Sequence, residues 1–98
     1  MEKHIEAYLV KRVKAMGGIA YKFVSPAHRG VADRIVCLPG GAVWFIELKA
    51  PGGRLSPLQK VFADDMKRLG QKYACLWSRE QVDGWIDESS CRSEEHTS

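Results

Sequence analysis

The feature that most constrains the fold is the run of residues 42–49, which is apolar at every position until Glu47. A strand that is apolar on both faces has to be covered on both sides, which favours a central strand between two layers of helices. Turn-forming residues bound the run, with Pro39-Gly40-Gly41 before it and Pro51-Gly52-Gly53 after it. Because residues 33–38 are also strand-like, the first turn predicts a β-hairpin.

Two amphipathic helices are predicted from apolar spacing and end signals. The first is predicted because apolar residues recur at helical spacing from Ile5 to Met16. It ends at Gly17-Gly18, since glycine accepts the left-handed conformation at a helix C-terminus. The second begins at Ser56-Pro57-Leu58-Gln59, where serine suits the N-cap, proline the first helical position and glutamine a capping box. Its predicted buried stripe is Leu58, Phe62, Met66 and Leu69.

The rest of the chain predicts two more strands, at residues 19–24 and 73–77, and a short helix after Ser78. The order α-β-β-β-α-β-α indicates an α/β fold, a mixed sheet flanked by helices. We expect residues 1–88 to form a single domain and the polar residues 89–98 to form a disordered tail. The tryptophans lie in apolar patterns and are predicted to be core residues (Trp44, Trp77 and Trp85).

The sequence also bounds where the protein works. No apolar run approaches the roughly 18 residues that span a bilayer, so we expect no membrane association. The N-terminal residues lack the apolar segment of a signal peptide, which predicts a cytoplasmic protein. The three cysteines have no paired spacing and indicate reduced thiols rather than disulfides or a zinc site.

The charge of the chain is uneven. Residues 1–86 carry 14 basic and eight acidic side chains, whereas residues 87–98 are acidic. A small basic domain favours a polyanionic partner, nucleic acid first.

Glu47, Lys49 and Asp33 are the candidate chemical residues. Glu47 and Lys49 share a strand face, because side chains alternate along a strand. If Pro39-Gly40-Gly41 is a three-residue loop, the hairpin register places Asp33 directly opposite Glu47. Two carboxylates held that close repel each other unless a cation lies between them, and oxygen ligands suit Mg²⁺ or Mn²⁺. A two-residue turn would instead place the pair on opposite faces, and the plainer interpretation is an exposed ion pair at a strand end.

A metal between these carboxylates predicts phosphodiester hydrolysis, because it can activate water and stabilise the leaving oxygen. Lys49 could orient or deprotonate the water and screen transition-state charge. An acidic residue of the first helix, Glu2 or Glu6, could complete the site, and we favour Glu6 because residue 2 lies at the fraying end.

Three segments resemble the VRR-NUC domain of the PD-(D/E)XK nuclease superfamily, which includes restriction endonucleases and Holliday-junction resolvases. They are residues 30–34 (GVADR), 45–51 (FIELKAP) and 55–59 (LSPLQ), in the order and spacing of the family across residues 2–86. Members of the family commonly carry proline before the aspartate, where this chain has Ala32.

The resemblance implies a restriction-endonuclease-like αβββαβ core, with Asp33 and Glu47 as metal ligands and Lys49 as the catalytic lysine. It also implies a supporting glutamate on the first helix and a functional role for Gln59. The capping box explains Gln59 equally well without catalysis, so both interpretations stay open.

Basic residues near the predicted site are candidates for DNA phosphate contacts. They are Lys22, Arg29, Arg34 and Arg54. We therefore expect a Mg²⁺-dependent DNA endonuclease, with branched or junction DNA as a candidate substrate, and the alternative is a non-catalytic nucleic-acid-binding module with a nuclease fold. The small size of the protein and the resemblance both favour a homodimer.

Overall fold

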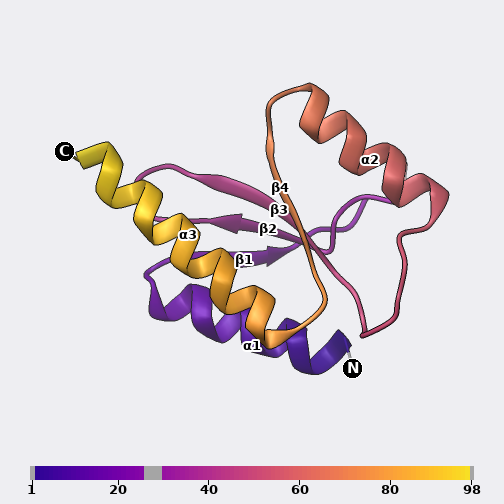
Figure 1. The fold of residues 1–98 in the computed structure, drawn as a ribbon, viewed down its shortest axis with the longest axis horizontal. Coiled ribbons are helices and arrows are strands. Elements are labelled where there is room, and N and C mark those ends of the chain that lie inside the picture. The colour runs from indigo at the N-terminus through magenta and orange to yellow at the C-terminus, as the bar shows by residue number, and fades with distance from the viewer. Residues whose placement is uncertain (1, 26–29, 98) are drawn as a thin grey trace.

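The fold was analysed in a computed structural model that describes residues 2–25 and 30–97. Three helices and four strands follow one another in the predicted order (Figure 1). Their bounds are α1 (Glu2–Ala15), β1 (Ile19–Lys22), β2 (Arg34–Cys37), β3 (Val43–Leu48), α2 (Pro57–Arg68), β4 (Lys72–Leu76) and α3 (Arg79–Thr97).

The strands form one mixed sheet in the order β1-β2-β3-β4. Strand β2 pairs antiparallel with both β1 and β3. Strands β3 and β4 are parallel, and α2 connects them. The predicted mixed sheet with flanking helices is confirmed, and the apolar run 42–49 supplies an interior strand of it.

The main core lies between one face of the sheet and the helices α1 and α3, which run side by side (Figure 1). Alternate residues of β3 point into this layer, so Trp44, Ile46 and Leu48 are nearly fully buried. The helices and neighbouring strands complete it with Ile5, Leu9, Val13, Val36, Leu76, Val82, Trp85 and Ile86.

The opposite face of the sheet is covered by α2 through a cluster of aromatic rings. Phe62 of α2 packs edge-on against Phe45 of β3 and Tyr73 of β4, with ring centroids 5.9 and 6.1 Å apart. Phe23, just after β1, lies 6.4 Å from the same ring. These contacts hold α2 over the half of the sheet that carries the candidate site.

The predicted buried stripe of α2 is wrong at its two ends. Leu58 and Leu69 are 51% and 55% exposed, and the buried residue of the helix is Ala63. The helix meets the sheet along the side that carries Phe62 and Ala63, and with 3.6 residues per turn both leucines lie roughly a quarter turn from the centre of that side, at the edge of the contact. Spacing alone identifies an apolar stripe but does not say which side of it meets the sheet.

The C-terminal helix is longer than the sequence predicted. The structure continues α3 to Thr97, through most of the segment expected to be disordered. No proline or glycine follows Trp85, so no residue in this segment breaks the helical backbone.

No helix among the described residues is long and apolar enough to cross a membrane.

Candidate active site

The hairpin places the two predicted carboxylates opposite each other. Leu38 N donates to Ala42 O at 2.8 Å, and Arg34 pairs with Ile46, so the next position outward sets Asp33 against Glu47. The three-residue loop predicted from Pro39-Gly40-Gly41 therefore gives the predicted register.

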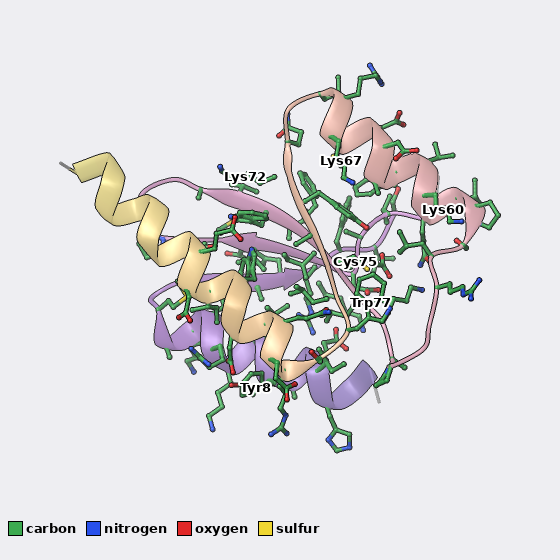
Figure 2. All side chains as sticks on the ribbon, viewed as in Figure 1. Tyr8, Lys60, Lys67, Lys72, Cys75 and Trp77 are labelled. Atoms are coloured by element: carbon green, nitrogen blue, oxygen red, sulfur yellow. The ribbon has the colours of Figure 1, made fainter. Side chains whose placement is uncertain are left out.

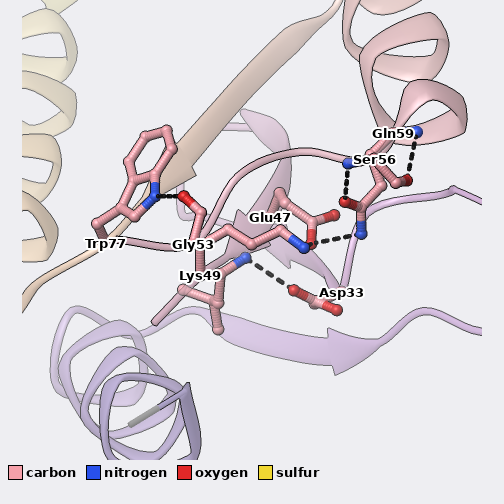
Figure 3. A network of polar contacts seen from close by, with 8 residues as sticks. Asp33, Glu47, Lys49, Gly53, Ser56, Gln59 and Trp77 are labelled. Atoms are coloured by element: carbon pink, nitrogen blue, oxygen red, sulfur yellow. Dashed lines mark hydrogen bonds and ion pairs between the residues drawn. The ribbon is translucent and has the colours of Figure 1, made fainter. Parts of the chain in front are cut away.

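Asp33 is fixed at the start of β2 by a contact across the hairpin. Its Oδ2 accepts a hydrogen bond from the backbone N–H of Leu48 at 2.7 Å (Figure 3). This bond orients the Asp33 side chain. The bond engages one of the two carboxylate oxygens.

Glu47 is the most buried charged side chain of the site, with 2% of its surface exposed. Its Oε2 lies 3.7 Å from Lys49 Nζ and accepts a hydrogen bond from Gln59 Nε2 at 3.2 Å. A buried carboxylate is costly unless it is paired and hydrogen-bonded, and these two groups meet that requirement (Figure 3). Lys49 is itself mostly buried, so the pair is shielded from solvent.

Gln59 forms the predicted capping box and also contacts Glu47. Its Oε1 accepts from Ser56 N at 2.8 Å, and Ser56 Oγ accepts from Gln59 N at 3.2 Å, which completes the predicted capping box. Its Nε2 reaches Glu47. The Gln59 side chain thus links the start of α2 to the Glu47 carboxylate, because an amide can accept and donate hydrogen bonds at the same time.

Cys75 is a residue of this site that the sequence did not identify. The parallel register of β3 and β4 places it beside Glu47, so Asp33, Glu47 and Cys75 form one row across three strands. Burial, and after it the Glu47 carboxylate, raise the pKa of the Cys75 thiol to about 11 against the opposing effect of Lys49. The thiol is therefore neutral near pH 7.

This shift predicts a pH-dependent loss of stability. Between about pH 9 and pH 11 the Cys75 thiol ionises in the unfolded chain but stays protonated in the folded one, so the free energy of unfolding falls across that window. Urea unfolding of wild type and Cys75→Ala at pH 8 and pH 11 measures the effect. We expect wild type to lose more stability than Cys75→Ala, and equal losses would contradict the assignment.

The structure does not bring Glu6 to the carboxylate pair. Glu6 Oε2 accepts from Arg34 Nε at 2.9 Å and lies 2.8 Å from Nη2, while Arg34 Nη1 donates to Ala20 O. Arg34 follows Asp33 directly, so its side chain points to the opposite face of the sheet, toward α1. Glu6 and Arg34 thus pair with each other, which leaves Arg34 poorly placed for the phosphate contact predicted for it.

The other two predicted phosphate contacts are both exposed. Lys22, at the end of β1, pairs with Arg34 and so shares its face, opposite to the carboxylates. Arg54 lies between Lys49 and α2. Arg29 lies outside the described residues.

The donor set of the site fits a magnesium-type ion. Asp33 and Glu47 offer carboxylate oxygens from facing positions. Among residues 4–25 and 30–89, no group of three or more His, Cys, Asp or Glu side chains could hold a metal. Mg²⁺ is usually held by one or two carboxylates and keeps several waters, whereas structural zinc needs four protein ligands. These residues therefore suit Mg²⁺ or Mn²⁺.

Comparison with known structures identifies the fold. A solved structure described as a VRR_NUC domain superimposes on this chain with a TM-score of 0.84, at 29% sequence identity, covering 88% of this chain and 94% of that one. The chain has the VRR-NUC fold. The resemblance predicted from the three sequence motifs is thereby confirmed.

Sequence comparison adds a phage relative to the VRR-NUC fold. No family model matches the sequence. A protein of Acyrthosiphon pisum secondary endosymbiont phage 1, named "Putative nuclease p44", is 57% identical over 58 residues, which are 59% of this chain. The match spans 62% of the length of that relative.

Proposed function

We propose that this chain is a metal-dependent DNA endonuclease that hydrolyses phosphodiester bonds at the Asp33–Glu47 pair. The observation that carries the proposal is the register that sets these carboxylates opposite each other, with Lys49 Nζ 3.7 Å from Glu47 Oε2. The VRR-NUC fold and the name of the phage relative support a nuclease. The phage source of that relative also supports activity in the cytoplasm of a bacterial or phage-infected cell.

Asp33 and Glu47 are the residues that would hold Mg²⁺ or Mn²⁺. When bound there, such an ion would polarise a phosphodiester oxygen and lower the pKa of a water molecule. The Leu48 N–H fixes the orientation of Asp33, and Gln59 fixes that of Glu47. Both carboxylates are thus pre-oriented before a ligand arrives, which reduces the reorganisation that binding requires.

Lys49 is the proposed catalytic lysine. Its ammonium lies beside Glu47 on the face that carries both carboxylates, so it can hold the attacking water or screen the negative charge of the transition state. Because Lys49 is largely buried, its charge acts in a medium of lower dielectric than bulk water, where it is more effective.

DNA is the proposed substrate, and branched or junction DNA is its proposed preferred form. The excess of basic side chains in residues 1–86 suits a polyanion, with Arg54 exposed between Lys49 and α2. The second candidate is a nucleic-acid-binding module without catalysis. The presence of Asp33, Glu47 and Lys49 together on one face favours the enzyme.

A panel of labelled DNAs separates these candidates. Four-way junction, flap, nicked and plain duplex substrates are each incubated with Mg²⁺ or with EDTA, and binding is measured in parallel by fluorescence anisotropy. We expect cleavage with Mg²⁺ only, faster on branched DNA. Binding to every substrate without cleavage would favour the binding module, and equal rates on all four would remove the preference for branches.

The proposed enzyme acts as a homodimer, in which two active sites can cut two strands. Apolar residues left exposed on the α2 side of the molecule support this and would form the contact: Ile19, Tyr21, Val43, Leu58 and Leu69. Light scattering at micromolar concentration should give twice the chain mass of 11.0 kDa. A mass of one chain that junction DNA leaves unchanged would contradict the dimer.

A further inference from the structure

Trp77 lies beside the candidate site rather than in the core, where the sequence predicted it. It follows β4, near Cys75 and at the start of α3 (Figure 2). Its indole Nε1–H donates to the backbone oxygen of Gly53 at 2.8 Å (Figure 3). The side chain is only half-buried and is absent from the core cluster between the sheet, α1 and α3. A specific polar contact therefore accounts for its position better than core packing.

The acceptor of this bond belongs to the turn that follows Lys49. Gly53 N donates to Ala50 O at 2.8 Å, and Gly52 has φ of 81°, a left-handed conformation that favours glycine. A Cβ built on Gly53 would lie 2.9 Å from Ala50 O and 3.6 Å from the Cβ of Lys49. The backbone of Gly53 therefore lies close to the first carbon of the Lys49 side chain.

Two adjacent glycines make this turn flexible unless another group restrains it, because glycine has the largest backbone freedom. Trp77 is well placed to provide that restraint. Its backbone N–H donates to Gln81 Oε1 at 2.6 Å, and Ser78 Oγ accepts from Gln81 N, so the tryptophan is fixed to the start of α3. The backbone of Lys49 is joined to the same segment, since Lys49 N donates to Leu76 O at 3.0 Å.

We propose that Trp77 is a positioning residue for Lys49: its indole N–H holds Gly53, and Gly53 confines the lysine stem beside Glu47. This inference rests on the proposed nuclease function. It assigns the hydrogen bond a role in the chemical step, since Lys49 Nζ reaches the reacting phosphate only if its stem is held. The bond does not itself touch DNA or metal.

Trp77→Phe tests the inference, because phenylalanine keeps an aromatic ring and removes the N–H. We expect kcat for Mg²⁺-dependent cleavage to fall about threefold to tenfold, the worth of one hydrogen bond, with KM for DNA within about twofold of wild type. Hydrogen exchange at the Gly53 amide, without metal or DNA, should become faster. If Trp77 only stabilised the fold, Trp77→Phe would lower the melting temperature without lowering kcat at constant KM.

Trp85→Phe is the matched control. Trp85 Nε1 is buried and has no hydrogen-bond partner among residues 4–25 and 30–89, so this change removes an indole N–H without removing a described bond. It should leave kcat and hydrogen exchange at the Gly53 amide unchanged at a temperature where all variants are folded.

If wild type cleaves and Trp77→Phe keeps the wild-type kcat, or if hydrogen exchange at the Gly53 amide is unaltered, the inference is wrong and the nuclease function stands. If wild type itself cuts no DNA, the proposed function fails and the role of Trp77 falls with it.

Discussion

Replacing Glu47 with glutamine should abolish Mg²⁺-dependent cleavage of DNA while the protein stays folded. The substitution keeps the size of a side chain that is 2% exposed and removes its charge, so the site loses a proposed metal ligand. Metal-assisted charge stabilisation is worth several kcal/mol, which predicts a fall in kcat of at least about 10³-fold. Asp33→Asn should have the same effect, because the register sets Asp33 opposite Glu47 as the second proposed ligand.

The melting temperature of these variants distinguishes loss of catalysis from loss of the folded structure. Asp33→Asn relieves the repulsion between the carboxylates, so we expect its melting temperature without metal to be equal to that of wild type or higher. Glu47→Gln also takes the charge partner of Lys49 away, so we expect it to stay folded with a lower melting temperature. Asp65→Asn is the matched control, since Asp65 is an exposed α2 carboxylate that pairs with Arg68. It should cleave like wild type. Wild-type cleavage by Glu47→Gln or Asp33→Asn would show that the metal assignment is wrong.

Lys49→Ala should lower kcat much more than DNA affinity. One lysine contributes only a fraction of the phosphate contacts, whereas its charge beside Glu47 acts directly at the proposed reaction centre. We expect kcat to fall about 10²-fold, typical of losing one positioned charge or proton donor, with Kd for DNA changing less than about threefold. Single-turnover cleavage and anisotropy titrations measure the two quantities separately.

Lys67→Ala provides the control for loss of one positive charge. Lys67 is exposed near the C-terminal end of α2, at the opposite end of the helix from Gln59 (Figure 2). It should change kcat by less than about twofold. Affinity of wild type should fall steeply with salt, as counterion release requires. Equal losses of affinity and kcat in Lys49→Ala would make Lys49 a binding residue instead.

The parts of the site that depend on local geometry could be predicted from the sequence. A short hairpin loop fixes the register of its strands, so counting outward from Pro39-Gly40-Gly41 was enough to place Asp33 opposite Glu47. The N-cap of α2 was equally local, since Ser56 and Gln59 lie three residues apart. The resemblance implied a functional role for Gln59, and its contact with Glu47 is seen only in the structure.

The parts that depend on packing could not be predicted. The register of parallel strands is set by how the connecting helix docks, so no local pattern predicts that Cys75 lies beside Glu47. The helical wheel left the direction of Glu6 open, and in the structure Glu6 of α1 pairs with Arg34 of β2. Trp77 and Gly53 are 24 residues apart, and an apolar pattern does not distinguish a core tryptophan from one that donates a hydrogen bond.

The central claim is that Asp33 and Glu47 hold one divalent cation between them. Anomalous diffraction from crystals grown with Mn²⁺ tests it most directly, because the ion is located independently of activity. We expect an anomalous peak within about 2.0–2.6 Å of a carboxylate oxygen of each residue, the range of oxygen ligands around such ions. The same crystals of Glu47→Gln should lack the peak. Fully occupied Mn²⁺ elsewhere, with none between Asp33 and Glu47, would contradict the claim.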